Sequence, residues 1–174
     1  DLDNVGIFGH SGGGFMSTAA LLTYPDFYDV ACSSAGNHDN NIYNKWWSET
    51  HNGVEAVYKK KKDDDGNEVE ELTWNAKIKT NQSLANNMKG HLLLTHGNID
   101  NNVHPTNSLR LADELIKAGK RFDMMIFPGK RHGYGSFRSY YEKMMWYYFA
   151  EHLLGDYRSE EHTSELQSPM YLVC

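Results

Sequence analysis

Three residues of this chain have the chemical character needed to transfer an acyl group: Ser11, Asp100 and His132. In such a reaction a serine attacks a carbonyl carbon, a histidine takes and returns the serine proton, and an aspartate orients the histidine. Ser11 lies within Gly9-His10-Ser11-Gly12-Gly13, a G-x-S-x-G pattern. We predict that Ser11 is the nucleophile, that His132 is the general base, and that Asp100 orients His132.

The glycines around Ser11 are explained by a sharp turn. A serine on such a turn needs neighbours with almost no side chain, because the backbone must pack closely and the substrate must approach. A helix that begins directly after Ser11 would place the serine at a positively polarised N-terminus, which favours the negative oxygen of the transition state. We predict that the backbone N–H of Gly12 is one donor to this oxyanion.

Each of these residues also has an interpretation without catalysis. The G-x-S-x-G segment can be a glycine-rich turn before a helix. Asp100 can be a turn residue, because Asn and Asp are frequent in its surroundings, and His132 can be one surface histidine among nine. Catalysis is favoured because the three residues each follow an apolar segment of strand length.

A metal site is the other common use of histidines. His10, His38, His96 and His104 fall near the predicted site, but they form no H-x-x-x-H spacing, and the chain has no C-x-x-C. We expect neither a catalytic metal nor a cofactor.

Apolar runs predict the elements that position Ser11. Residues 5–8 predict a buried strand, and residues 15–22 predict a helix that ends at Tyr24-Pro25. Residues 28–34 predict the next strand. The strand–helix–strand spacing indicates a parallel sheet.

Two later strands, predicted at 91–97 and 122–127, precede the loops of Asp100 and His132. Ligand sites gather at the carboxyl ends of parallel strands, and the order serine, aspartate, histidine is that of α/β-hydrolase triads. We therefore predict an α/β fold of the α/β-hydrolase type, with a parallel sheet flanked by helices.

Two further helices are predicted in the second half of the chain. One begins near Pro105 and buries an apolar face, and the other is capped by Ser136 and runs to Leu154. The expected apolar face of the first comprises Leu109, Leu111, Ala112, Leu115 and Ile116.

An insertion is predicted at residues 51–90. Segments 54–58 and 68–72 flank an Asp-Gly turn signal and predict a hairpin, with the Lys59–Lys62 run in its solvated tip. Residues 81–88 predict a helix that stops at Gly90.

Composition excludes several classes of protein. The 174 residues are 40% hydrophobic and carry a formal charge of −6, which gives no electrostatic reason to bind nucleic acid or an anionic membrane. No apolar run is long enough to span a membrane.

We expect one partial catalytic domain at 1–157, without the first strands of its sheet. Residues 158–174 resemble a translated sequencing adapter and are interpreted as an artefactual tail.

Four motifs carry a resemblance to a known family: Gly9-His10-Ser11-Gly12-Gly13, Ser34-Ala35-Gly36-Asn37, residues 96–104 and Arg131-His132-Gly133. They resemble the catalytic domain of the prolyl oligopeptidase family, peptidase family S9, in its dipeptidyl-peptidase-IV-like branch. The resemblance implies a serine exopeptidase that releases N-terminal dipeptides, often with Pro or Ala second.

The resemblance also implies substrate contacts and partners. Tyr43 and Val103 match walls of the S1 pocket, which holds the substrate residue before the scissile bond, and Asn102 matches a polar contact to the substrate carbonyl. Family members carry an N-terminal β-propeller and an upstream oxyanion tyrosine, which this sequence lacks. The family suggests a periplasmic or secreted enzyme and allows a homodimer. We expect residues 1–157 alone to be inactive.

Two alternatives stay open at this point. A carboxylesterase or an acylaminoacyl-peptidase would share both the fold and the three candidate residues. A non-catalytic binding module of the same fold would require that one of the three be replaced.

Overall fold

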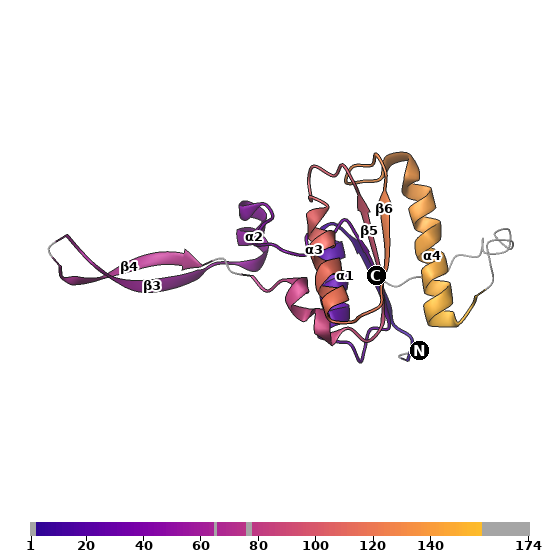
Figure 1. The fold of residues 1–174 in the computed structure, drawn as a ribbon, viewed down its shortest axis with the longest axis horizontal. Coiled ribbons are helices and arrows are strands. Elements are labelled where there is room, and N and C mark those ends of the chain that lie inside the picture. The colour runs from indigo at the N-terminus through magenta and orange to yellow at the C-terminus, as the bar shows by residue number, and fades with distance from the viewer. Residues whose placement is uncertain (1–2, 65, 76–77, 158–174) are drawn as a thin grey trace.

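The computed structural model describes residues 3–64, 66–75 and 78–157, so the predicted artefactual tail lies outside the described residues. Strands, α-helices and two 3₁₀ helices follow one another along the chain (Figure 1). Their bounds are β1 Gly6–His10, α1 Gly12–Thr23, β2 Val30–Ser34, α2 Lys45–Asn52, β3 Glu55–Lys62, β4 Glu68–Asn75, η1 Asn81–Asn87, β5 His91–Gly97, α3 Thr106–Lys117, β6 Asp123–Phe127, η2 Gly135–Phe137 and α4 Arg138–Leu154.

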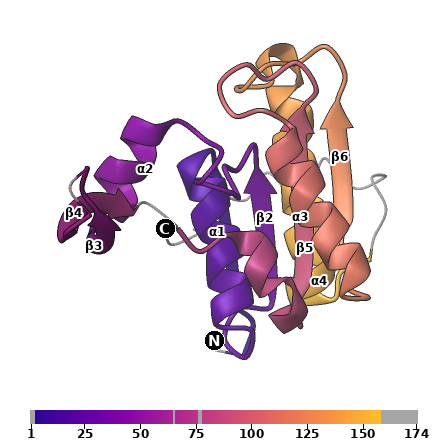
Figure 2. The same cartoon turned by 60° about the vertical axis from the view of Figure 1, so that its left-hand side comes forward.

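Four strands form one parallel sheet in the order β1-β2-β5-β6. The predicted α/β architecture is confirmed: α1, η1 and α3 lie on one face of the sheet and α4 lies on the other (Figure 2). Because the strands are parallel, the loops that follow β1, β2, β5 and β6 all emerge at the same edge. This edge receives all three residues predicted to perform catalysis.

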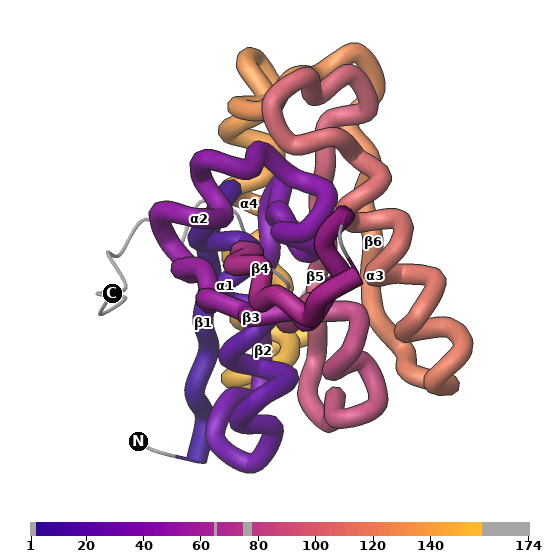
Figure 3. The backbone as a smooth tube through the Cα atoms, turned by 90° about the vertical axis from the view of Figure 1, so that its left-hand side faces the viewer, coloured from indigo at the N-terminus to yellow at the C-terminus, as the bar shows by residue number. Residues whose placement is uncertain are grey.

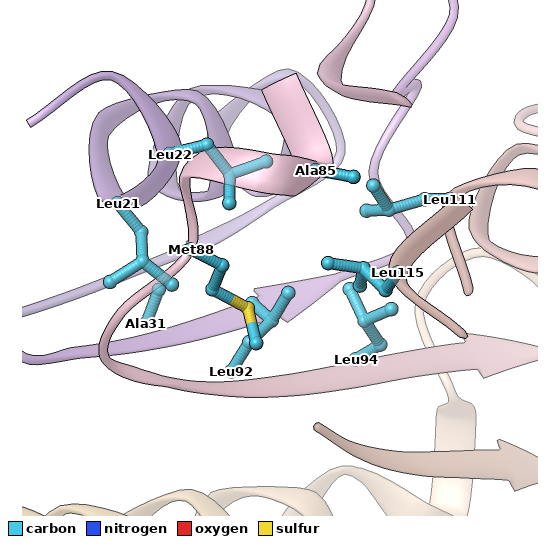
Figure 4. Close-up of a cluster of buried hydrophobic side chains, with 9 residues drawn as sticks. All are labelled: Leu21, Leu22, Ala31, Ala85, Met88, Leu92, Leu94, Leu111 and Leu115. Carbon is cyan, nitrogen blue, oxygen red and sulfur yellow. The ribbon is translucent and has the colours of Figure 1, made fainter. Parts of the chain in front are cut away.

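The central strands β2 and β5 are buried on both faces, and alternate residues pack against different helices. Ala31, Leu92 and Leu94 point toward α1, η1 and α3, where they form a cluster with buried leucines (Figure 4). Val30 and Leu93 point to the opposite face and pack against α4. This alternation explains why the strand sequences are continuously apolar. Both clusters hold the carboxyl ends of the strands in fixed register.

A long antiparallel ribbon projects from the parallel-sheet domain (Figure 1). It consists of β3 and β4, and Figure 3 views the molecule approximately along its length. The predicted hairpin is confirmed, but its strands are longer than expected. Lys59–Lys62 belong to β3 instead of the tip, because they pair with residues 68–71 of β4. Lys60 and Lys61 also form ion pairs with Glu68 and Glu71.

Some local predictions are wrong. Residues 81–87 form a 3₁₀ helix, and Thr80 caps it by accepting a hydrogen bond from Ser83 N. On α3, Leu109 and Ile116 are exposed, because the buried face of the helix runs through Leu111 and Leu115.

The last helix also begins later than expected. Ser136 lies in the 3₁₀ turn η2 instead of capping α4, and its hydroxyl accepts a hydrogen bond from Lys130 Nζ. Helix α4 begins at Arg138 and has no side-chain cap.

Candidate active site

Ser11 lies on a strained turn between β1 and α1. Its backbone has φ 60° and ψ −121°, a conformation that an L-residue with a side chain rarely adopts. Ser11 N donates a hydrogen bond of 2.8 Å to Ser34 O, and Ser11 O accepts one of 3.0 Å from Phe15 N. The neighbouring strand and the first turn of the helix therefore hold the strained residue at the sheet edge.

Close backbone contacts explain two of the surrounding glycines. A Cβ on Gly9 would collide with the Gly13 carbonyl, and a Cβ on Gly14 would lie 2.6 Å from Ser34 O. Only glycine permits the chain to fold back this tightly. Gly12 is the first residue of α1, where backbone N–H groups have no partner within the helix. The N–H of Gly12 is therefore available for a ligand oxygen.

Asp100 and His132 are joined by a direct hydrogen bond. His132 Nδ1 lies 2.7 Å from Asp100 Oδ2, and Asp100 is 3% exposed. The other carboxylate oxygen accepts hydrogen bonds from the backbone N–H groups of Asn102 and Val103, at 2.9 and 3.1 Å. These bonds fix the carboxylate. A proton on Nδ1 leaves Nε2 of a neutral His132 ring free to accept one.

His96 is a second histidine beside Asp100. Its Nε2 lies 3.3 Å from Asp100 Oδ2 and 2.8 Å from the Val103 carbonyl oxygen, while its Nδ1 lies 2.8 Å from Ser108 Oγ. Burial lowers the pKa of His96, which favours a neutral ring. Nε2 therefore serves as a donor that supports the Asp100 loop. The sequence indicated His96 as a candidate metal ligand and as part of the 96–104 motif, and this contact to Asp100 was not expected.

A ring contact brings the segment that carries Ser11 next to the loop of His132. His10 directly precedes Ser11, and its ring centroid lies 4.7 Å from that of His132. Among the described residues, the Ser11 hydroxyl and the His132 ring form no hydrogen bond. Such bonds are frequently long in ligand-free enzymes and shorten when substrate binds. The loops after β1, β5 and β6 thus meet at one place on the sheet edge.

The residues predicted to contact substrate lie around this place. Tyr43 Oη donates a hydrogen bond of 2.9 Å to Asn102 Oδ1, which joins the loop after β2 to the Asp100 loop. Burial and the negative charge of Asp100 raise the pKa of Tyr43. The Val103 side chain is fully buried. Its role as a pocket wall stays a prediction.

Two tryptophans of α2 differ in their placement. A Cβ on Gly12 would lie 3.1 Å from Trp47 Cζ2, so the indole covers the residue after the serine. Trp47 also contacts the rings of Tyr43 and His51. Trp46 is largely exposed. The wall beside the serine is therefore aromatic.

The described part of the chain contains no group of three or more His, Cys, Asp or Glu side chains that could hold a metal ion. None of its helices is long and apolar enough to cross a membrane.

Comparison with known proteins identifies the relatives of this chain. Residues 1–156 match the sequence profile of the prolyl oligopeptidase family. Dipeptidyl peptidase 8 of Mus musculus is 31% identical over 155 residues, which cover 88% of this chain and 16% of the relative. Dipeptidyl peptidase family member 1 of Caenorhabditis elegans is 31% identical over 137 residues, or 78% of this chain and 15% of the relative. The chain thus spans about a sixth of the length of these curated relatives.

Two of the solved structures with the same fold come from bacteria. A candidate dipeptidyl aminopeptidase IV from Bacteroides ovatus has a TM-score of 0.69 at 23% identity, with 88% of this chain and 20% of that chain covered. Porphyromonas gingivalis dipeptidyl peptidase 4 has a TM-score of 0.66 at 23% identity, with 90% and 20% covered. These likenesses confirm the α/β-hydrolase fold. The chain belongs to the prolyl oligopeptidase family, and it resembles the dipeptidyl-peptidase-IV-like branch, as its motifs predicted.

Proposed function

We propose that this chain carries the catalytic serine, aspartate and histidine of a serine peptidase. The observation that supports this most strongly is the 2.7 Å hydrogen bond between Asp100 and His132. It lies at the same sheet edge as Ser11, whose backbone is strained in the manner of a nucleophile on a sharp turn. Family membership agrees with this assignment.

In the proposed reaction, His132 Nε2 takes the proton of Ser11 Oγ as the oxygen attacks the substrate carbonyl. The negative oxygen that forms is stabilised by the N–H of Gly12 at the N-terminus of α1. His132 then gives its proton to the leaving amine, and an acyl-enzyme stays on Ser11. Water hydrolyses this ester by the same proton transfers in reverse. Throughout the cycle, the Asp100 carboxylate stabilises the protonated His132 ring.

The proposed substrates are peptides from which an N-terminal dipeptide is released, with Pro or Ala second. The relatives quoted above are named dipeptidyl peptidases, and this supports the assignment. Tyr43, Asn102 and Val103 are proposed to contact the dipeptide. Recognition of the substrate amine is assigned to an N-terminal propeller like that of family members, and a homodimer is an expected assembly.

The test uses the full-length enzyme that contains this chain. Ser11→Ala should abolish covalent labelling by a fluorophosphonate and reduce turnover of a Gly-Pro anilide by several orders of magnitude. Ser17→Ala, which changes a buried serine of the helix that follows Ser11, is the matched control and should retain both. Near-normal turnover by Ser11→Ala would exclude Ser11 as the nucleophile.

The same assay distinguishes related activities. The wild-type enzyme should prefer dipeptide anilides over short acyl esters and N-acylated peptides. A preference for the esters would assign a carboxylesterase, and a preference for N-acylated peptides would assign an acylaminoacyl-peptidase.

A further inference from the structure

We propose that Tyr134 and His10 are positioning residues for His132, joined through Ser34 into one hydrogen-bonded chain. The inference rests on the proposed acyl-transfer function, since it assigns to these residues the task of holding the general base.

The hydrogen-bonded chain crosses the sheet edge below the site. Tyr134 Oη accepts a hydrogen bond of 2.8 Å from Ser34 Oγ and lies 2.9 Å from Thr95 Oγ1. Ser34 Oγ in turn lies 2.8 Å from His10 Nδ1. These hydrogen bonds thus link the carboxyl ends of β1, β2 and β5 to the loop that carries His132. Ser34 and Thr95 are fully buried and Tyr134 is 2% exposed, so water does not compete for the bonds among these three hydroxyls. The His10–Ser34 bond is partly buried.

Tyr134 anchors the loop of His132 from two residues away. Its backbone is left-handed, with φ 59°, which is costly for a bulky side chain. Its ring packs against Phe127 and Tyr141 at centroid distances of 4.6 and 5.3 Å. These contacts and the two hydroxyl contacts hold the unfavourable backbone in place. Loss of the hydroxyl partners would therefore loosen the turn on which His132 sits.

His10 restrains the His132 ring directly. The two imidazoles lie 4.7 Å apart at an angle of 55°, and the ring of His10 also meets that of Tyr134 at 5.9 Å and 88°. His132 is therefore held at Nδ1 by Asp100 and by ring contact with His10. The second contact depends on Ser34, because Ser34 fixes the orientation of the His10 ring.

The surroundings of His10 favour its uncharged form. Ser34 gives its single hydroxyl proton to Tyr134, so a neutral His10 donates from Nδ1. Burial and the neighbouring His132 lower the pKa of His10 to about 4. A second positive charge beside His132 would oppose the protonation that His132 undergoes during acyl transfer. Orientation and charge of His10 thus serve the same step.

The first experiment removes only the hydroxyl of Tyr134 in the full-length enzyme. Tyr134→Phe should lower kcat on a Gly-Pro anilide about five- to tenfold and leave KM within about twofold, as expected when one hydrogen bond that orders the base is lost. Tyr148→Phe is the matched control, because it removes the hydrogen bond that Tyr148 on α4 donates to Asp123, which lies at the start of β6, at the end opposite the site. It should retain wild-type kcat. Equal kcat in Tyr134→Phe and the wild type would overturn the proposal.

The second experiment tests whether the residues act as one chain. His10→Phe keeps a ring beside His132 but removes the bond to Ser34, and the double variant with Tyr134→Phe should lose no more than the worse single variant. Losses that simply multiply would contradict a single chain. His10→Asn keeps a donor near the position of Nδ1 and should retain more of kcat than His10→Lys, which adds a charge. The reverse ranking would also contradict the proposal.

Two controls separate this inference from the proposed function. A wild-type enzyme that neither reacts with a fluorophosphonate nor cleaves dipeptide anilides would overturn the function itself. An active wild-type enzyme whose kcat is unchanged by the Tyr134 and His10 substitutions would overturn only the positioning role.

A second variant covers the case in which Tyr134→Phe does not melt cooperatively. Ser34→Ala breaks the same hydrogen-bonded chain, and the same loss of kcat at unchanged KM is expected. Wild-type kcat in Ser34→Ala would then refute it.

Discussion

Asp100 Oδ2 lies 2.7 Å from His132 Nδ1 and 3.3 Å from His96 Nε2, so one carboxylate oxygen faces two imidazoles. His96 is buried and held by Ser108 and Val103, whereas His132 is 22% exposed and can reach a substrate. The carboxylate is therefore fixed on the side of His96 and acts on the side of His132. This arrangement makes Asp100 the residue whose charge matters most for the proposed base.

Asp100→Asn should keep the fold and reduce kcat by about 10⁴, because an amide at this position supports the wrong His132 tautomer. The measurement is steady-state turnover of a dipeptide anilide, with circular dichroism to check the fold. Asp113→Asn is the matched control, since Asp113 forms an exposed ion pair with Lys117 on α3 and should tolerate the change. A loss of less than about tenfold for Asp100→Asn would remove Asp100 from the proposed mechanism.

Tyr43→Phe should raise KM for a Gly-Pro anilide about two- to tenfold with little change in kcat. The substitution removes the hydrogen bond that orients Asn102 Oδ1, and a single neutral hydrogen bond contributes about 0.5–1.5 kcal/mol. Tyr58→Phe changes an exposed tyrosine of the β3–β4 ribbon and serves as the control. An unchanged KM would show that the Tyr43–Asn102 pair does not shape the substrate pocket.

Stability should fall as the pH is lowered below about 6.5, in part because of His38. Its side chain is fully buried, its Nδ1 pairs with Asn81, and its Nε2 has no hydrogen-bond partner among the described residues. Burial, and to a lesser degree His96, lower the pKa of His38 to about 3. Between pH 6.5 and about 3 the unfolded chain therefore binds a proton that the folded chain excludes, so unfolding becomes more favourable.

The measurement is the thermal midpoint of the full-length enzyme at pH 7 and pH 5. His38→Gln should show a smaller drop between these pH values than the wild type, even if its midpoint at pH 7 is lower. His104→Gln replaces an exposed histidine and should keep the wild-type pH dependence. Identical drops in His38→Gln and the wild type would show that His38 does not contribute.

Local sequence patterns predicted the sheet edge well, because Ser11, Asp100 and His132 each follow a strand that is apolar on both faces. They predicted α3 less well. Leu109 and Ile116 continue its apolar stripe, but periodicity alone does not say which part of a broad stripe meets the sheet. The hydrogen bonds that join His10, Ser34 and Tyr134 could not be predicted, because Ser34 and Tyr134 are 100 residues apart in sequence. Such contacts arise only when the strands align.

Residues 1–157 expressed alone should be insoluble or loosely packed and catalytically inactive. In the described sheet β1 pairs only with β2, so its other edge presents unpaired backbone groups that can template pairing with another chain. Phe8 on this strand and Met16 on the helix that follows it are exposed. A net stability of about 5–15 kcal/mol leaves little margin for such losses. Size-exclusion chromatography, thermal melting and a Gly-Pro anilide assay test this expectation, with the full-length enzyme as the control. A monomeric 1–157 polypeptide that melts cooperatively and cleaves the anilide would show that β1 needs no further partner strand.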